Sequence, residues 1–291
     1  MSRRIAVLAG DGIGPEVIAV GLERLDPSWE MVPIDAGAGR YLRTGDTITG
    51  SEVDAIRDCD ALLLGAVGDP RVPDGVLERG ILLRLRRELD LYVNLRPFPE
   101  LGIVFVRENT EGLYAGVGEC DEVHAFETSV NTRTAIQRTA GYAFRLARTR
   151  GDHLTWVHKT NVLTYAGGLW RAVVEDVSTS FPEVSVDYLH VDAAAYHLVR
   201  DPGRFDVVLT DNLFGDVLSD LAAGVGDGLG AAASANLHPD PQTRPQRCVG
   251  LFEPVHGSAP DIAGTGLADP SAAIGAVELL VDALEQEVAV T

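Results

Sequence analysis

Residues 204–224, RFDVVLTDNLFGDVLSDLAAG, join a short apolar run directly to an amphipathic stretch. The run at 207–210 predicts a buried strand, and residues 212–225 predict a helix. This order recurs along the chain. Further strands are expected at residues 5–9, 61–64, 103–106, 154–157 and 184–191, and further helices at residues 15–25, 76–89, 133–150, 169–181, 192–201 and 270–290. Short strands separated by helices are typical of βαβ units, so the predicted fold class is α/β with a mostly parallel sheet.

Composition narrows the possible functions. The chain has 291 residues, a length that suits two domains or one large α/β unit, and 46% of them are apolar, enough for a sizeable core. A formal net charge of −19 argues against binding to a nucleic-acid backbone. Three widely spaced cysteines, Cys59, Cys120 and Cys248, form neither a disulfide framework nor a CxxC metal site, which favours a reducing, cytoplasmic setting. No apolar run reaches the roughly 18 residues of a membrane span.

Two carboxylates in the opening stretch are candidates for a metal site. Asp216 and Asp220 are spaced i, i+4, so on a helix they share one face. Neighbouring carboxylates repel each other unless a cation or proton intervenes, and their hard oxygens suit Mg²⁺ or Mn²⁺. The alternative is an acidic solvated face or a set of helix caps, and Asp211 is itself a good cap residue.

Basic residues at predicted strand and helix ends are candidates for binding an acidic substrate. Arg86 lies near the end of a predicted helix, Arg96 after an apolar run and Arg107 at the end of a predicted strand. Converging guanidinium groups suit a dicarboxylate, whereas surface ion pairs are the alternative. Lys159 directly follows a predicted strand and is either a substrate ligand or base, or an ordinary surface lysine.

Two glycine-containing loops are candidates for a cofactor. GDGIGPE at residues 10–16 lies between a predicted strand and helix, but its glycine spacing does not match the Rossmann fingerprint. A tight turn with Pro15 in the first helical turn is expected there. In EPVHGSAPDIAG, residues 253–264, small residues allow close backbone approach to a ligand, and Asp261 is placed to accept from a ribose diol; an ordinary turn is the alternative.

Taken together, these motifs resemble the β-decarboxylating dehydrogenases, the family of isocitrate and 3-isopropylmalate dehydrogenases, and most closely its actinobacterial-type 3-isopropylmalate members. The matching strings, in chain order, are GDGIGPE, LLGAVGDP, LRLRRELDLYVNLRP, VRENTEGLY, HKTNVLT, VDAAAYHLV, RFDVVLTDNLFGDVLSDLAAG and FEPVHGSAPDIAG. The resemblance implies a two-lobed isopropylmalate dehydrogenase-like fold with a non-Rossmann cofactor site. It also implies a discontinuous cofactor-side domain, residues 1–91 plus 227–291, and a domain at 92–226 for substrate, metal and dimerisation.

The resemblance also assigns roles to individual residues. Arg86, Arg96 and Arg107 would hold the malate carboxylates, and Tyr114 would protonate the enol carbon. Lys159, in the proton relay, and Asp192 would come from the second subunit of a homodimer with shared active sites. The metal ligands would be Asp192, Asp216 and Asp220. The cofactor-binding residues would be Asn161, His256, Gly257, Ser258, Ala259, Asp261, Ile262 and Asp269.

Two short segments bear on the choice of cofactor and substrate. A carboxylate at Asp261, followed by Ile262, would repel a 2′-phosphate, so NAD is predicted. Leu82 and Leu83 lie where the family meets the 3-substituent, and an apolar pair favours isopropyl over a carboxylate. The predicted reaction is oxidative decarboxylation of 3-isopropylmalate. The alternatives are another 3-substituted malate, a tartrate- or isocitrate-type substrate, or a catalytically silent paralogue.

Departures from the family pattern keep those alternatives open. The connection at residues 98–101 and the segment 116–127 are shorter than in relatives, and Arg79 stands where some members have a glutamate, with Glu78 one position away. Two Pro- and Gly-rich stretches, residues 96–102 and 235–247, are possible crossings between lobes.

Overall fold

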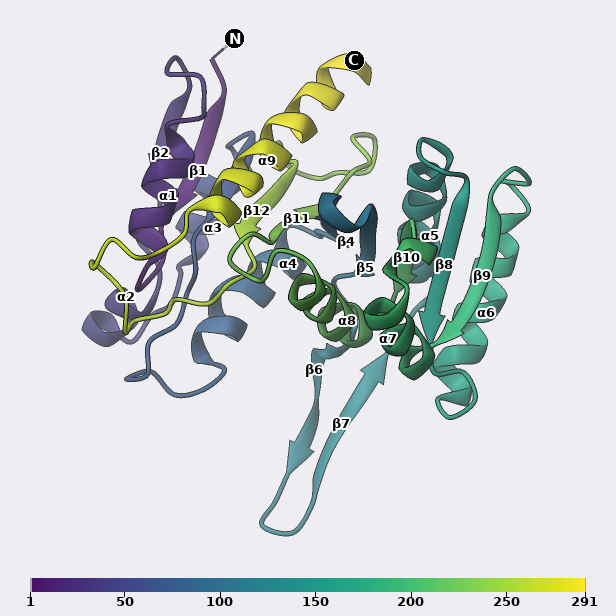
Figure 1. Cartoon of the computed structure of the whole chain (residues 1–291). Coiled ribbons are helices and arrows are strands. Elements are labelled where there is room, and N and C mark those ends of the chain that lie inside the picture. The colour runs from purple at the N-terminus through teal and green to yellow at the C-terminus, as the bar shows by residue number, and fades with distance from the viewer. Residues whose placement is uncertain (1, 291) are drawn as a thin grey trace. The chain divides into compact units, whose positions relative to one another are not determined.

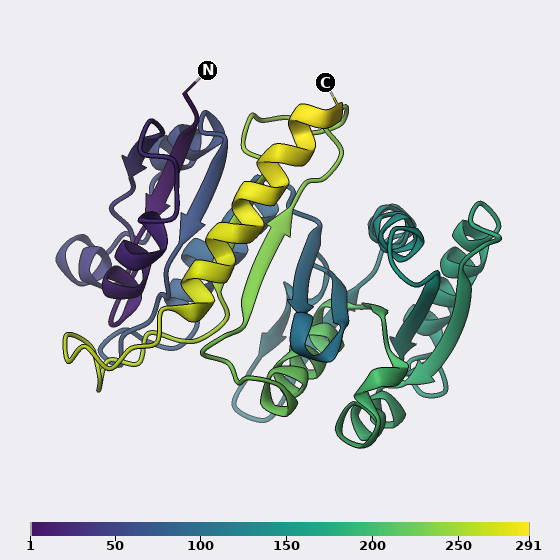
Figure 2. The ribbon, with the colours of Figure 1, turned by 45° about the horizontal axis from the view of Figure 1, so that its top comes forward.

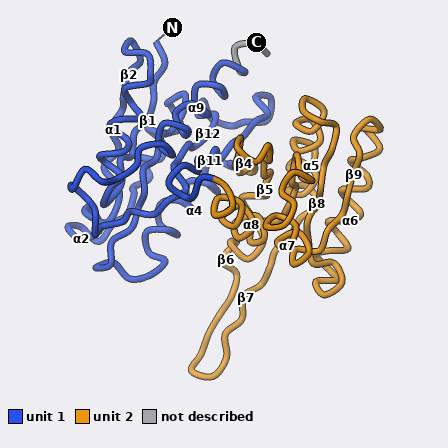
Figure 3. Tube along the Cα trace, in the orientation of Figure 1, with its two compact units in different colours: residues 1–91, 227–291 blue, residues 92–226 orange. Residues whose placement is uncertain are grey.

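The computed structural model of the chain describes residues 2–290, with side chains described through residue 286. The chain divides into two compact units (Figure 3). Unit 1 is Met1–Leu91 together with Asp227–Thr291, and unit 2 is Tyr92–Gly226. The chain therefore crosses between units after Leu91 and after Gly226, and not within either Pro- and Gly-rich stretch. Those stretches instead contain the ends of strands, where proline and glycine mark the following turns.

Unit 1 is built on a sheet with the strand order β2-β1-β3-β12-β11 (Figures 1 and 2). Its strands are β1 (Arg4–Leu8), β2 (Glu30–Pro33), β3 (Ala61–Leu64), β11 (Ala233–Leu237) and β12 (Gly250–Pro254). β1 runs parallel to β2 and β3, and β3 runs parallel to β12, whereas β11 and β12 are antiparallel. β3 is buried along its whole length, which explains why its sequence ALLL lacks alternation.

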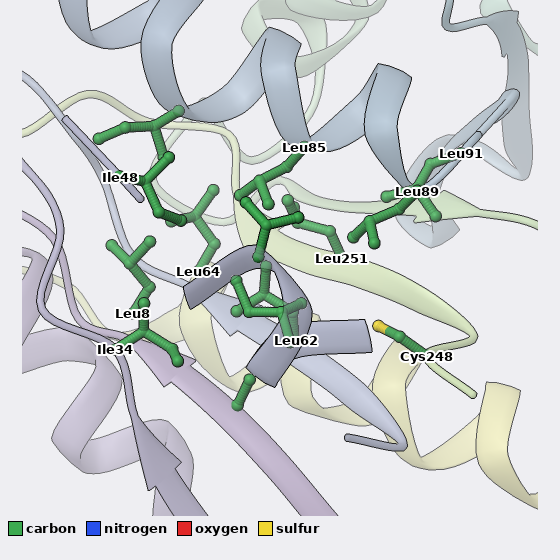
Figure 4. Packing of buried hydrophobic residues seen from close by; sticks show 14 of the residues in the cluster. Leu8, Ile34, Ile48, Leu62, Leu64, Leu85, Leu89, Leu91, Cys248 and Leu251 are labelled. Atoms are coloured by element: carbon green, nitrogen blue, oxygen red, sulfur yellow. The ribbon is translucent and has the colours of Figure 1, made fainter. Parts of the chain in front are cut away.

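Helices cover the sheet of unit 1. They are α1 (Gly14–Leu22), α2 (Ala38–Thr44), α3 (Gly50–Arg57), α4 (Leu83–Glu88) and α9 (Ser271–Val290). α1 packs against α9, and α9 also packs against β11 and β12. Leu62 and Leu64 of β3 belong to a buried cluster with Leu85, Leu89 and Leu251 (Figure 4).

The single helix predicted at residues 76–89 is wrong in detail. A π-helical turn, η1 (Glu78–Leu82), precedes α4, and its Leu83 N–H donates to the carbonyl of Glu78. Two features favour this wider turn: Gly80 is a poor helix former, and its carbonyl accepts a hydrogen bond from Thr47 Oγ1 at 3.1 Å.

Unit 2 has a sheet with the order β4-β5-β10-β8-β9. Its strands are β4 (Val93–Phe98), β5 (Ile103–Glu108), β10 (Val207–Thr210), β8 (His153–His158) and β9 (Ser185–His190). β5, β10, β8 and β9 are parallel, and among these strands β4 alone runs antiparallel to its neighbour β5. The α/β class with a mostly parallel sheet is therefore confirmed.

The helices of unit 2 pack in two pairs. α5 (Arg133–Arg148) contacts α6 (Thr164–Ser178) and the strands β5, β10 and β8, while α8 (Asn212–Val225) contacts α7 (Val191–Arg200) and the strands β4, β5 and β10. Because both α5 and α8 contact β10, all four of its residues are buried. β10 and α8 begin and end where the sequence predicts.

A separate hairpin extends from the rest of unit 2 (Figure 1). It consists of β6 (Gly112–Cys120) and β7 (Ala125–Val130), which pair in antiparallel fashion. Val123 and Phe126 are strongly exposed on it. No helix described in residues 2–290 combines the length and apolar character needed to cross a membrane.

The GDGIG turn in unit 1 has a structural role. The Asp11 carboxylate accepts the N–H groups of Ala38 at 2.9 Å, Gly39 at 3.4 Å and Gly68 at 3.1 Å. These bonds satisfy the first donors of α2 and fix the loop after β3. Pro15 lies in the first turn of α1, as predicted for a tight strand-to-helix connection.

A buried histidine–aspartate pair lies at the start of α8. His158 ends β8, and its Nε2 is 3.6 Å from Asp211 Oδ2, while Asp211 Oδ1 caps α8 by accepting the Phe214 N–H at 2.8 Å. Neither ring nitrogen of His158 has a hydrogen-bond partner among the described residues. Burial lowers the pKa of His158 to about 4 and raises the pKa of Asp211 to about 7.

The Asp11 network predicts a stability defect. Asp11→Ala should lower the free energy of unfolding by about 1–3 kcal/mol, because three backbone donors lose their acceptor. Urea denaturation measures this loss. Asp54→Ala, which removes only an exposed ion pair with Arg57, is the control and should change stability by less than about 1 kcal/mol. Equal stability of Asp11→Ala and the parent chain would contradict the assigned role.

The Asp211 carboxyl predicts a pH-dependent effect on stability. Its pKa of about 7 lies above the unfolded value of 3.8, so the folded chain binds this proton more tightly. The contribution to stability is therefore lost as pH rises from about 4 through 7. Asp211→Asn keeps a capping oxygen but cannot ionise. Relative to the parent chain, the variant should gain about 1–3 kcal/mol between pH 5 and pH 8, measured by urea denaturation at both values. A stability difference independent of pH would exclude this titration.

Candidate active site

The carboxylate of Asp216 is the centre of a polar cluster in unit 2. Its Oδ1 accepts hydrogen bonds from Arg107 Nη1 at 2.5 Å and Arg96 Nη2 at 3.1 Å, and its Oδ2 accepts from the Tyr114 hydroxyl at 2.5 Å. These residues come from α8, β5, β4 and β6 respectively. One side chain thus joins four elements of the unit.

Asp220 lies one turn further along α8 and extends this cluster. Its Oδ1 accepts from Arg96 Nη1 at 3.0 Å, and the same nitrogen donates to Ser219 Oγ at 2.9 Å. Burial raises the pKa of Asp220, and the nearby charge of Asp216 acts in the same direction. Because Arg96 contacts both carboxylates, the structure confirms that the i, i+4 pair shares one face of a helix.

The two guanidinium groups of this cluster are buried. The side chain of Arg96 is 7% exposed and that of Arg107 is 1% exposed. Buried cations are tolerated only where charge and hydrogen bonds are matched, so these residues are not surface ion-pair partners. Arg84, in contrast, forms an ion pair of the kind considered as the alternative, because its Nε donates to Glu88 Oε1 at 2.6 Å.

Arg86 belongs to unit 1 and has its own buried partners there. Its Nη2 donates to Glu253 Oε1 at 3.3 Å, and the same oxygen accepts from Asn236 Nδ2 at 2.9 Å. Leu82 and Leu83, the predicted substrate-selective pair, are half-buried at the junction of η1 and α4. The structure therefore groups Arg96 with Arg107, and places Arg86 with the two leucines in the other unit.

A lysine–aspartate pair forms a second polar group in unit 2. Lys159 Nζ donates to Asp192 Oδ1 at 2.5 Å, and this hydrogen bond holds the pKa of Asp192 below its usual value. Lys159 follows β8 and Asp192 lies in the first turn of α7, just after β9. Because β5, β10, β8 and β9 are parallel, Arg107, Lys159 and Asp192 all lie at the carboxyl edge of this sheet, the usual place for α/β sites.

The acidic pair on α8 suits a hard divalent cation in its donor chemistry. Asp216 and Asp220 supply only carboxylate oxygens, and their negative charge is met here by guanidinium cations. Within the described part of one chain, no group of three or more His, Cys, Asp or Glu side chains is arranged to hold a metal ion. The pair fits such a cation in chemistry only, and a metal ion there would need further oxygens from a substrate or another chain.

The predicted cofactor loop of unit 1 packs closely against the GDGIG turn. Ser258 O accepts the Ile13 N–H at 2.8 Å, and a Cβ on Gly12 would lie only 1.9 Å from that oxygen. Gly12 has a φ of +57°, so only glycine suits this position. Ala259, with a φ of +36°, is held in an unfavourable left-handed conformation of the kind found at ligand sites.

The other predicted cofactor residues lie at three different places in the chain. His256 and Ile262 are half-buried, Gly257 and Asp261 are exposed, and all lie in the loop that follows β12. Asp269 instead caps the start of α9, accepting from Ser271 N at 2.9 Å and Ser271 Oγ at 2.6 Å. Asn161 is exposed in unit 2, two residues after Lys159.

Sequence reasoning missed the buried polar residues that surround the charged ones. Asn94, Asn212, Ser219, Asn236 and Glu253 all hydrogen-bond to the predicted site residues or to their partners. Asn212 and Ser219 lie within the opening stretch, and the signal available was a polar side chain on the sheet-facing side of a predicted helix.

Comparison with known proteins agrees with this geometry. The family model described as isocitrate/isopropylmalate dehydrogenase matches residues 4–289. A 3-isopropylmalate dehydrogenase from Nocardia farcinica is 53% identical over 302 residues, covering 97% of this chain and 89% of that protein. One from Mycobacterium tuberculosis H37Rv is 52% identical over 303 residues, covering 97% and 88%.

Solved structures show the same architecture. The crystal structure of isocitrate dehydrogenase from Methylococcus capsulatus has a TM-score of 0.86 and 36% identity, covering 97% of this chain and 86% of that one. A β-decarboxylating dehydrogenase from Thermococcus kodakarensis has a TM-score of 0.80 and 39% identity, covering 98% and 84%. The chain belongs to the isocitrate/isopropylmalate dehydrogenase family.

Proposed function

We propose that the chain catalyses the NAD- and divalent-metal-dependent oxidative decarboxylation of 3-isopropylmalate to 2-oxo-4-methylpentanoate. The observation that carries the proposal is the cluster around Asp216, in which two buried guanidinium groups, two carboxylates and a phenol meet. The names of the Nocardia and Mycobacterium relatives support the choice of substrate.

The cluster contains the groups needed to bind a dicarboxylic substrate. Arg96 and Arg107 each present several N–H donors, which bind carboxylates through paired, charge-assisted hydrogen bonds. We assign Arg86 of unit 1 to the same task, with Leu82 and Leu83 facing the apolar 3-substituent. When bound by Asp216, Asp220 and the partner subunit's Asp192, Mg²⁺ or Mn²⁺ would stabilise negative charge on the substrate, and NAD would accept the hydride.

Proton transfers are assigned to Tyr114 and Lys159. The Tyr114 hydroxyl donates to Asp216 Oδ2, and the Arg107 guanidinium lies 5.2 Å from the centre of its ring, so the phenol is held in one orientation. Tyr114 would then deliver its proton to the enol carbon after CO₂ leaves. The partner subunit's Lys159 would take the proton of the substrate hydroxyl.

Exposed apolar residues near Asp192 support a homodimer with shared sites. On α7, which carries Asp192, Tyr196 is 61% exposed and Val199 is 56% exposed, and on the neighbouring α8 Val217 is 59% exposed. Covering such a surface with a second copy would bury apolar area, and in the proposed dimer Lys159 and Asp192 serve the other chain's site. Phe126 and Val123 of the hairpin add further exposed apolar surface.

The cofactor is assigned to unit 1. The loop at residues 256–262 lies against the GDGIG turn with small side chains and exposed backbone, as a dinucleotide requires. The exposed Asp261 carboxylate would accept from a free ribose hydroxyl and repel a 2′-phosphate, which favours NAD over NADP. Localisation in the cytoplasm stays a prediction from the cysteine pattern.

The assignment of Asp216 leads to a test of activity. The purified chain with NAD, Mn²⁺ and 3-isopropylmalate should produce NADH and CO₂, followed by absorbance and by CO₂ trapping. Asp216→Asn should lower kcat by at least about 10³-fold, because the buried guanidinium groups and the metal lose their shared carboxylate. Asp187→Asn, on the exposed side of β9, is the control. Activity retained in Asp216→Asn would refute the assignment, and an inactive parent chain would favour the silent paralogue.

The leucine pair leads to a test of specificity. The kcat/KM for 3-isopropylmalate should exceed that for isocitrate by at least about 100-fold, because a carboxylate facing Leu82 and Leu83 would be desolvated without a partner. Replacing both leucines with serine should reduce this ratio, mainly by lowering the kcat/KM for 3-isopropylmalate. A panel with tartrate and other 3-alkyl malates identifies the alternatives, and a better substrate in that panel would overturn the choice of isopropyl.

A further inference from the structure

We propose that Asn212 is a positioning residue, which orients Arg107 with a neutral oxygen and so adds no further negative charge where an anionic substrate would bind. The inference rests on the proposed function for its substrate. Its geometric basis lies wholly within unit 2.

Asn212 binds one whole edge of the Arg107 guanidinium group. It is the first residue of α8 and is fully buried. Its Oδ1 accepts from Arg107 Nε at 3.1 Å and from Arg107 Nη2 at 2.6 Å. Two donors on a single acceptor fix the plane of the guanidinium group, and the remaining nitrogen, Nη1, is directed at Asp216.

The amide nitrogen of Asn212 binds the backbone just before the hairpin. Asn212 Nδ2 donates to the Glu111 carbonyl at 3.1 Å, immediately before β6 begins at Gly112. Tyr114 lies two residues further along β6. One side chain therefore ties together the strand end that carries Arg107, the strand that carries Tyr114 and the helix that carries Asp216.

The aliphatic part of the Arg107 side chain packs against Gly215 of α8. A Cβ on Gly215 would lie 2.7 Å from Arg107 Cγ, so only glycine leaves room for the stem at this turn of α8. Arg107 is thus fixed at its stem by packing and at its head by Asn212. The guanidinium group has little freedom to adjust if the amide is removed.

The neutrality of the amide matters because the charges of the cluster are already balanced. Two guanidinium groups face two carboxylates, Asp216 and Asp220. Aspartate at position 212 would offer Arg107 similar acceptors but would add a negative charge opposed to a dicarboxylate. Burial already raises the pKa of the adjacent Asp211 to about 7, so a further carboxylate is poorly accommodated here.

The second arginine of the cluster is held in the same way. Asn94 is fully buried, and its Oδ1 accepts from Arg96 Nε at 3.0 Å. In the register of β4 with β5, Asn94 is directly opposite Arg107. Both buried arginines therefore donate from Nε to a neutral amide oxygen, and each also meets a carboxylate through a terminal nitrogen. The repetition argues for a shared requirement and not for chance packing.

The experiment compares Asn212→Asp and Asn212→Ala in the full chain, with Asn131→Asp as a matched control. Asn131 is in the same unit, accepts from Trp170 Nε1 at 3.0 Å and lies outside the cluster. At saturating Mn²⁺ and NAD, Asn212→Asp should raise the KM for 3-isopropylmalate by about tenfold or more, with a smaller change in kcat. Asn212→Ala should lower kcat/KM by about 100-fold or more. Asn131→Asp should change neither value by more than about twofold.

A second measurement does not depend on activity. The ¹⁵Nε–¹H signal of Arg107, assigned by its loss in Arg107→Lys, should shift or broaden in Asn212→Ala and remain sharp in Asn131→Asp. An unchanged signal, or an unchanged KM in Asn212→Asp, would overturn the proposal. If the parent chain does not oxidise 3-isopropylmalate, the proposed function fails. Titration with malate then replaces the KM measurement, and the Arg107 signal still decides the role of Asn212. If Asn212→Ala does not fold, Asn212→Asp carries both measurements.

Discussion

The hydrogen bonds received by Asp216 join four elements of unit 2 at a single carboxylate. Two buried guanidinium groups and a phenol meet one carboxylate on α8, so β4, β5, β6 and α8 are held in fixed positions at this point. Removing that carboxylate would take a charged partner from two buried cations, Arg96 and Arg107, which is far more costly than losing an exposed ion pair. The same contacts that join these elements also hold both guanidinium groups in place for the proposed substrate.

The topology explains why chemically active residues from distant parts of the sequence can meet. In unit 2, Arg107, Lys159, Asp192 and Asn212 all lie at or just after the carboxyl ends of the parallel strands β5, β8, β9 and β10. In unit 1, the GDGIG turn and the loop at Gly68 follow the parallel strands β1 and β3, and Ser258 lies against that turn. A parallel sheet delivers its loops to one edge, so within each unit the fold gathers the residues proposed for that unit's part of the chemistry.

Sequence predicted the elements with strong local signals and missed those defined by distant partners. β10 and α8 begin and end where the sequence predicts, because three apolar residues and a threonine are followed by a capping aspartate. No strand is expected from the sequence at residues 93–98, whose second half falls in the Pro- and Gly-rich stretch 96–102, and only the pairing of β4 with β5 makes it a strand. The i, i+4 spacing placed Asp216 and Asp220 together, but convergence of Arg96 and Arg107 depends on strand register, which one sequence does not reveal.

The discontinuity of unit 1 has a consequence for synthesis of the protein. β3 pairs with β12, and α1 packs against α9. In the sequence, however, the whole of unit 2 lies between β3 and these two later elements. While the ribosome is translating unit 2, the leucines of β3 have no neighbour on that side. The nascent N-terminal segment must therefore wait, with apolar surface uncovered, until the last part of the chain emerges, whereas unit 2 is contiguous and can fold first.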